Sequence, residues 1–277
     1  MARRSLLSAF LLFVVLSGTA QAKLSAKEEK MVKDLRGAAR TTYLVKSFSV
    51  HKATTTSTDM YLSVLDLPLS SVTTEEQVTV RLRKPGSIDF YGKVSKVETD
   101  PFGGAPTKSG AEEVLVGYVW WARRQGETSW TEPDFDDKDN SDLLGYSSSF
   151  KEDATGMEVL DSLYASKIES IESIEAPTNR ESCYKIVPTR KALLEDVGGD
   201  DFLERMIVHG KYSGNICVDK ETGFLSTTAL SMVTGGFTAK MEDFEVRLKR
   251  MDYKSKTTFS KFGEPVDLPD VSSPTAT

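Results

Sequence analysis

Apolar and polar side chains alternate with a period of two along most of the chain from Thr41 to Phe262. Turn-forming residues interrupt the alternation at short intervals, as at 84–86, 125–126 and 221–223. Because successive side chains of a strand point to opposite faces of a sheet, the pattern predicts antiparallel strands joined by hairpins. The predicted strands cover residues 42–52, 58–66, 76–83, 87–98, 112–123, 127–131, 167–175, 181–188, 211–219, 223–233, 237–249 and 252–261.

A helix precedes these strands. Ser25 and Glu28 have the spacing of a capping box, so the helix is predicted to begin there and to end near Arg40. Its apolar side chains recur at helical spacing and would form one buried face, made of Met31, Val32, Leu35, Ala38 and Ala39.

Two further helices are predicted between strands, at about 156–165 and 190–208, where apolar residues recur at helical spacing. The glycine pair at 198–199 is expected to split the second helix into two pieces. An aspartate at 200–201 would cap the later piece, and the glycine at 210 would end it.

Polar and turn-rich stretches predict loops. Residues 99–110 are rich in Pro, Gly and Thr and are interpreted as a mobile loop, and 54–58 as a short polar loop. The acidic stretch 134–142 is predicted to be a solvated loop, since its spacing fails the EF-hand pattern. Residues 271–277 are predicted to be a flexible tail.

Two predicted strands carry most of the apolar surface. In the strand 76–83, Val78, Val80 and Leu82 alternate with polar residues, which predicts one dry face. The strand 112–123 is apolar on both faces: the first carries Val114, Val116, Tyr118 and Trp120, and the second carries Leu115, Val119 and Trp121. Either this is a central strand covered on both faces, or one face lines a cavity for an apolar ligand.

The first residues predict export. Arg3 and Arg4 precede an apolar stretch at 6–16 and a small-residue exit at 20–22, so residues 1–22 are interpreted as a removable signal peptide. No later segment reaches 18 uninterrupted apolar residues, which predicts no transmembrane segment in the mature chain. The expected location is therefore periplasmic or secreted.

Cys183 and Cys217 are the only cysteines. In an oxidising compartment an even pair favours a structural disulfide, and the alternative is two buried free thiols. Neither residue belongs to a C-x-x-C motif, which argues against a redox centre.

Composition and charge exclude several classes of function. The formal net charge is −6, and loss of Arg3 and Arg4 with the signal would make the chain more acidic, which argues against a nucleic-acid partner. Two histidines and two cysteines leave few ligands for a metal, so no metal site and no cofactor are predicted. Carboxylates are scattered, the hydrolase, dinucleotide and zinc-protease motifs are absent, and no catalytic residue or enzyme activity is expected.

Two motifs resemble those of a known superfamily. Residues 78–91 read VTVRLRKPGSIDFY and are similar to the strand, Pro-Gly turn and strand near the front of LolA-like lipoprotein carriers and outer-membrane lipoprotein-sorting proteins. Residues 259–269 read FSKFGEPVDLP and resemble the closing strand and exit of the same superfamily, especially its mycobacterial lipid-carrying lipoprotein branch. The lipobox cysteine of that branch is replaced by Thr19. Arg81 or Arg83 lies nearest to the arginine with which some carriers hold their lid helices.

The resemblance implies an α+β fold: a strongly curved antiparallel β half-barrel with helices packed on its concave face, spanning residues 23–270 as a single domain. It implies a monomeric binding protein that shields a lipid or an acylated protein, with the helices near 156–165 and 190–208 as a lid. The residues expected to bind the ligand are Val78, Val80, Leu82, Ile88, Phe90, Val114, Val116, Tyr118, Trp120, Leu160, Leu163, Leu194, Phe202 and Met206. The alternative is an envelope protein-interaction or sensor module of the same fold, which would bind a protein partner through the acidic loop and the edge strands.

Overall fold

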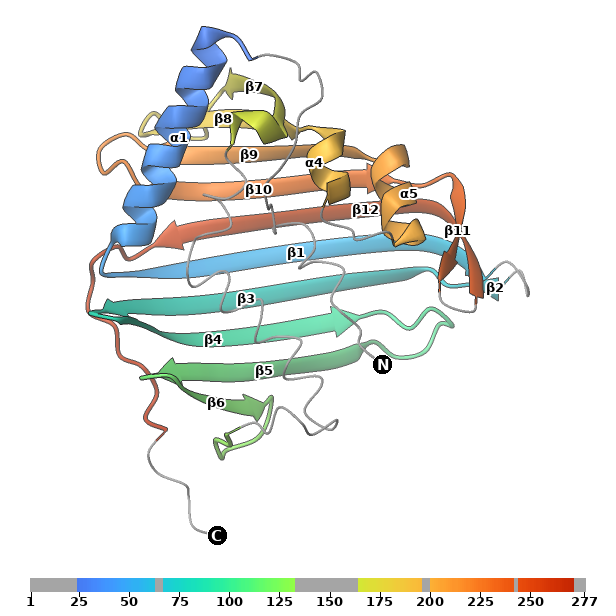
Figure 1. The fold of residues 1–277 in the computed structure, drawn as a ribbon. Helices are drawn as coiled ribbons and strands as arrows, with labels where there is room; N and C mark the ends of the chain where they lie inside the picture. The colour runs from blue at the N-terminus through green and yellow to red at the C-terminus, as the bar shows by residue number, and fades with distance from the viewer. Residues whose placement is uncertain (1–23, 63–66, 133–163, 196–199, 242–243, 272–277) are drawn as a thin grey trace.

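The described strands form one open antiparallel sheet (Figure 1). The computed structural model describes residues 24–62, 67–132, 164–195, 200–241 and 244–271. The main path of the sheet runs in the order β6-β5-β4-β3-β1-β12-β10-β9-β8-β7, while β11 pairs with β12 and β2 pairs with β1. The strands are β1 (Ser47–Leu62), β2 (Leu67–Pro68), β3 (Ser71–Lys84), β4 (Ser87–Glu98), β5 (Thr107–Val116), β6 (Val119–Arg124), β7 (Ile168–Ile174), β8 (Glu181–Pro188), β9 (Lys211–Asp219), β10 (Leu225–Thr234), β11 (Phe237–Met241) and β12 (Phe244–Ser260). The predicted antiparallel sheet is thus confirmed.

The helices lie on one face of this sheet (Figure 1). They are α1 (Ala26–Leu44), α4 (Arg190–Glu195) and α5 (Asp201–His209), and a 3₁₀ helix, η3 (Ala165–Lys167), precedes β7. We call the side that carries α1 and α5 the helix-bearing face and the other side the open face. Residues paired in register share a face, and the face alternates along each strand, so every strand residue can be assigned to one of the two.

The first helix begins as its sequence predicts. The Ser25 hydroxyl accepts a bond from the backbone N–H of Glu28, and the Glu28 carboxylate accepts from the N–H of Ser25, which completes the capping box. The helix runs on to Leu44, however, so the prediction that it ends near Arg40 is wrong. One reason is Thr42, whose hydroxyl bonds the carbonyl of Ala38 and accepts from the N–H of Leu225 in β10. The tertiary contact outweighs the β preference of this residue.

Strand β1 is longer than predicted. The polar stretch 54–58 lies inside it and pairs with β3 and β12 on its two sides, so the predicted loop is wrong. β-branched threonines suit a pleated strand, and the Thr54 hydroxyl bonds that of Ser255 across β1 and β12. The hairpin from β11 to β12 also turns earlier than predicted, and 127–131 supplies only an isolated bridge from Ala122 to Thr131.

The predicted strand 112–123 is two strands. β5 ends at Val116, β6 begins at Val119, and Gly117 and Tyr118 between them have φ angles of 57° and 74°. Positive φ at both central residues is the geometry of a type I′ turn, which Gly allows and Tyr usually avoids. β6 is the outermost described strand on this side of the sheet, whereas β5 lies between β4 and β6 with Glu113 and Val114 buried on its two faces. The explanation by a central strand therefore applies to β5 and not to β6.

Two apolar cores hold the helices. α1 packs its predicted apolar face on β1, β12 and the β7–β10 side of the sheet, with Leu35, Phe48 and Phe259 in one cluster. α5 packs on β10, β11 and β12, with Phe202 and Met206 in the other. Asp200 caps α5 by accepting from the N–H of Leu203, and Gly210 follows its last residue, which confirms the predicted ends of this helix.

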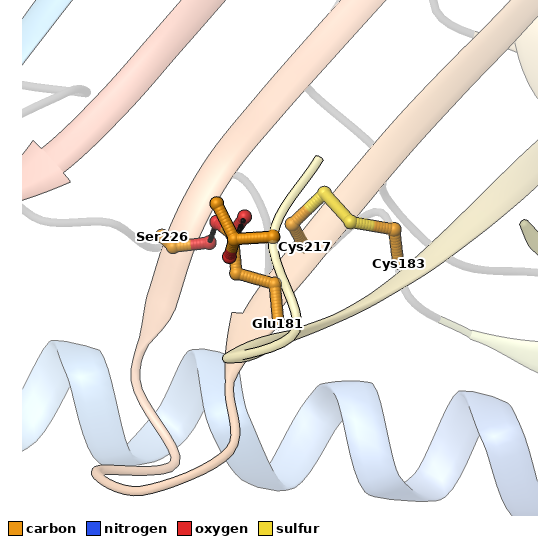
Figure 2. Close-up of a disulfide and its surroundings, with 5 residues drawn as sticks. Glu181, Cys183, Cys217 and Ser226 are labelled. Carbon is orange, nitrogen blue, oxygen red and sulfur yellow. Dashed lines mark hydrogen bonds between the residues drawn. A yellow bond between two sulfur atoms is a disulfide. The ribbon is translucent and has the colours of Figure 1, made fainter. Parts of the chain in front are cut away.

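The disulfide is confirmed. Cys183 of β8 and Cys217 of β9 face each other in register and are bridged (Figure 2). Ile216 points into the core beneath α1, so the next residue, Cys217, lies on the open face. Beside the bridge, the hydroxyl of Ser226 in β10 donates to the carboxylate of Glu181 at 2.6 Å. The bond joins β8 to β10 across β9.

Candidate functional site

The alternation of β3 is reversed relative to the sequence prediction. Gln77, Thr79 and Arg81 are buried on the helix-bearing face, whereas Val78 on the open face is 38% exposed. Val80 and Leu82 share the open face and are half-buried. The expectation that the valine face of this strand is the dry one is therefore wrong: Gln77 donates to the Thr79 hydroxyl, and Arg81 bonds the end of α1.

Of these buried polar side chains, Arg81 has the best-defined contacts. Its side chain is fully buried, and its guanidinium donates to the carbonyls of Tyr43 at 3.0 Å and Val45 at 2.6 Å, at the C-terminal end of α1. The cation also lies 4.1 Å from the centre of the Phe48 ring. Burial lowers the pKa of Arg81 to about 10, and the charge of Arg83 adds to this effect. Arg81 thus fastens the last turn of α1 to the sheet, where the helix dipole favours a cation.

A third apolar cluster covers β4, β5 and β6 on the helix-bearing face. We call it the β4–β6 cluster; its members are Phe90, Val94, Ala111 and Ala122, with Leu115 and Trp120 partly buried against them. Phe90 and Trp120 meet edge to face, with ring centroids 6.0 Å apart. None of these residues belongs to a described helix, which distinguishes this cluster from the two cores under α1 and α5.

The structure brings together only some of the predicted ligand-binding residues. Phe90 and Trp120 lie in the β4–β6 cluster, and Ile88 shares their face. Val114 and Val116 point to the open face with Val78, Val80 and Leu82. The predicted set is thus divided between the two sides of the sheet.

The remaining predicted residues lie elsewhere. Tyr118 is 78% exposed in the β5–β6 turn, where its hydroxyl donates to the carbonyl of Gly86. Phe202 and Met206 are buried between α5 and the sheet, and Leu194 is half-buried in α4. Leu160 and Leu163 lie outside the described residues, as does the predicted helix 156–165 up to residue 163; Ala165 begins η3.

Glu113 is a residue that the sequence reading missed. It lies on the helix-bearing face of β5, its side chain is 0% exposed, and neither carboxylate oxygen makes a hydrogen bond of good geometry, although the Trp120 indole interacts with the carboxyl. Burial raises the pKa of Glu113 to about 9, although the indole of Trp120 favours the charged form. Burial thus favours the neutral carboxylic acid at this position. The sequence does place Glu113 two residues from both Ala111 and Leu115, so strand alternation alone puts its side chain on an apolar face.

The adjacent Glu112 lies on the open face and is fully paired. It accepts from Arg123 at 2.7 Å and Tyr91 at 3.1 Å, and Lys93 approaches it at 3.2 Å. Burial raises the pKa of Glu112, but the bonds from Arg123, Lys93 and Tyr91 outweigh burial and lower it. The open face of these strands therefore has a closed network of charges and offers less to an apolar ligand.

The helix-bearing face is thus apolar in three places and polar between them. Such a surface can bury an amphipathic molecule without any covalent step. Among the described residues, no group of three or more His, Cys, Asp or Glu side chains is placed to hold a metal ion. No helix in the described ranges has both the length and the apolar character needed to cross a membrane.

Comparison with known proteins assigns no family to the chain. No protein-family model and no curated protein matches the chain. Among solved structures the chain is similar to a DUF1329 family protein from Desulfovibrio piger ATCC 29098, with 14% identity over 88% of this chain and 95% of that chain. The TM-score is 0.28, so the two structures share too little geometry to assign a fold or a function to this chain.

Proposed function

We propose that the chain is an extracytoplasmic binding protein that holds an apolar ligand, a lipid or the acyl chain of a lipoprotein, on the helix-bearing face of its sheet. In this proposal the sheet acts as a LolA-like half-barrel, with that face on its concave side, and the protein binds without catalysis. The resemblance of residues 78–91 and 259–269 to LolA-like carriers motivates the proposal.

The β4–β6 cluster is the observation that carries the proposal. α1 and α5 each have an apolar cluster of their own, whereas Phe90, Trp120 and their neighbours have no helical member among the described residues. Phe90, Val94, Ala111 and Ala122 are only 0–3% exposed, so an acyl chain would bind here by replacing the contacts that now bury them. Each buried methylene contributes about 0.8 kcal/mol, so a chain of moderate length could bind tightly without a charged contact.

Two adjacent tryptophans make a sharp test. Trp120 lies on the helix-bearing face and Trp121 on the open face, and Trp130 is the third tryptophan of the chain. The variant W121F/W130F keeps only Trp120, and W120F/W130F keeps only Trp121. Delipidated protein would be titrated with methyl stearate brominated at mid-chain, an uncharged ester, because bromine quenches an indole only at short range.

We expect saturable quenching of the variant that keeps Trp120 and little quenching of the matched variant that keeps Trp121. Native mass spectrometry of protein from its own envelope should also show a bound lipid. Absence of quenching at Trp120, or equal quenching of both variants, would contradict binding at this face. A stable protein partner without any lipid would favour the sensor alternative.

A further inference from the structure

Glu113 stands in a row of small residues. The register places Thr79, Gly92, Glu113 and Ala122 side by side across β3, β4, β5 and β6 on the helix-bearing face. Gly92 and Ala122, the immediate neighbours of Glu113, have the smallest side chains available. Larger apolar side chains lie about 7 Å away along the strands, in the row of Phe90, Leu115 and Trp120. In the row of Glu113 itself they begin beyond Thr79, at Val50 of β1.

The Glu113 carboxyl is the only strongly polar side chain among the members of the β4–β6 cluster and the row that crosses it. Leaving a buried polar group without a hydrogen bond costs about 1–3 kcal/mol, so such groups call for an explanation. In its neutral form the carboxyl has one O–H donor and one free carbonyl acceptor. It is therefore suited to an uncharged oxygen and unsuited to a cation or an unshielded anion.

We propose that Glu113 binds the uncharged oxygen, an ester carbonyl or a hydroxyl, at the polar end of a ligand whose acyl chain lies on the β4–β6 cluster. This inference rests on the proposed function and adds to it the chemical class of the ligand. The apolar side chains give affinity for the chain, and Glu113 gives preference for an oxygen-bearing chain over a plain alkane. Trp120, whose indole favours the charged form of Glu113, lies at the same end of the site.

The test compares dodecanol and methyl dodecanoate with dodecane. Each would displace the uncharged fluorescent probe N-phenylnaphthylamine from delipidated full-length protein. The variants are E113L, which removes the polar group at similar volume, and E113Q, which keeps a donor and an acceptor. The matched control is E112Q, one residue along the same strand and on the other face.

We expect the wild-type protein to prefer the two oxygen-bearing ligands over dodecane by roughly five- to tenfold, the worth of one hydrogen bond. E113L should lose this preference but keep its affinity for dodecane, while E113Q and E112Q should keep the preference. An E113L protein that still prefers dodecanol overturns the role of Glu113 and leaves the proposed function standing. A wild-type protein that takes up no apolar probe overturns both the role of Glu113 and the proposed function. Thermal unfolding curves of each variant show whether that variant is folded.

Discussion

Glu112 and Glu113 are consecutive residues of β5 whose side chains lie on opposite faces of the sheet and have opposite surroundings. The Glu112 carboxylate is paired with Arg123, Lys93 and Tyr91, whereas that of Glu113 is fully buried and makes no hydrogen bond of good geometry. The pKa of Glu112 is lowered and that of Glu113 is raised. Two identical side chains on neighbouring Cα atoms, about 3.8 Å apart, should therefore give the stability of the protein opposite dependences on pH.

Replacement of Glu113 by Gln should stabilise the protein at neutral and alkaline pH. The pKa of Glu113 is about 9 in the folded chain against an ordinary value of 4.5 in the unfolded chain. The stability that the neutral carboxyl contributes is therefore fully present below pH 4.5 and is lost as pH rises towards 9. The loss has a slope of at most about 1.4 kcal/mol per pH unit. Urea unfolding at pH 8 should show E113Q to be more stable than wild type by a few kcal/mol, and the two should converge near pH 4. Equal stability at pH 8 would contradict a buried, unpaired carboxyl.

Replacement of Glu112 by Gln should have the reverse effect. Arg123, Lys93 and Tyr91 stabilise the charged carboxylate, so the contribution of Glu112 is present above its ordinary pKa of 4.5 and is lost as pH falls below that value. E112Q should therefore cost about 1–3 kcal/mol at pH 7 and much less at pH 3. The same urea series gives the measurement. A penalty that does not shrink in acid would indicate lost packing instead of lost charge pairing.

Elements whose ends have their own side-chain chemistry could be predicted from the sequence. Ser25 and Glu28 start α1, and Asp200 and Gly210 bound α5, because a cap acts within three residues of the chain. The cysteine pair was predicted for a comparable reason, since compartment and even number suffice. The turn at Tyr118 was not predicted, because a tyrosine with positive φ departs from the usual turn residues.

Which face of a strand lies inside could not be read from alternation alone. Arg81 is buried because carbonyls 36 and 38 residues earlier each accept a hydrogen bond from its guanidinium, and nothing local in β3 reveals them. Glu113 is buried without an oppositely charged partner or a hydrogen bond of good geometry, so a rule that places charged residues outside fails there. Both residues belong to the candidate site, where departures from local rules are expected.

Loss of the two hydrogen bonds from the Arg81 guanidinium should destabilise the last turn of α1. A lysine at this position cannot span the two carbonyls of Tyr43 and Val45, so R81K should lose about 2–4 kcal/mol of stability. The control is R83K, because Arg83 is half-buried on the same strand and its guanidinium lies 5.4 Å from the centre of the Tyr43 ring. Hydrogen exchange should show lost protection in the last turn of α1 for R81K and not for R83K. Equal loss in both variants would contradict a specific role for Arg81.

The bridge between Cys183 and Cys217 should stabilise the sheet mainly by restricting the unfolded chain. It closes a loop with a sequence separation of 34 residues, for which the chain-entropy estimate is about 3.5 kcal/mol. The double variant C183A/C217A should lose about this amount in urea unfolding, and reduction of the wild-type protein should lower its stability to nearly the same level. The variant itself should not respond to the reductant. Because the bridge lies on the open face, the variant should still bind the brominated acyl chain at Trp120, whereas lost binding in a folded variant would place the ligand on the other side of the sheet.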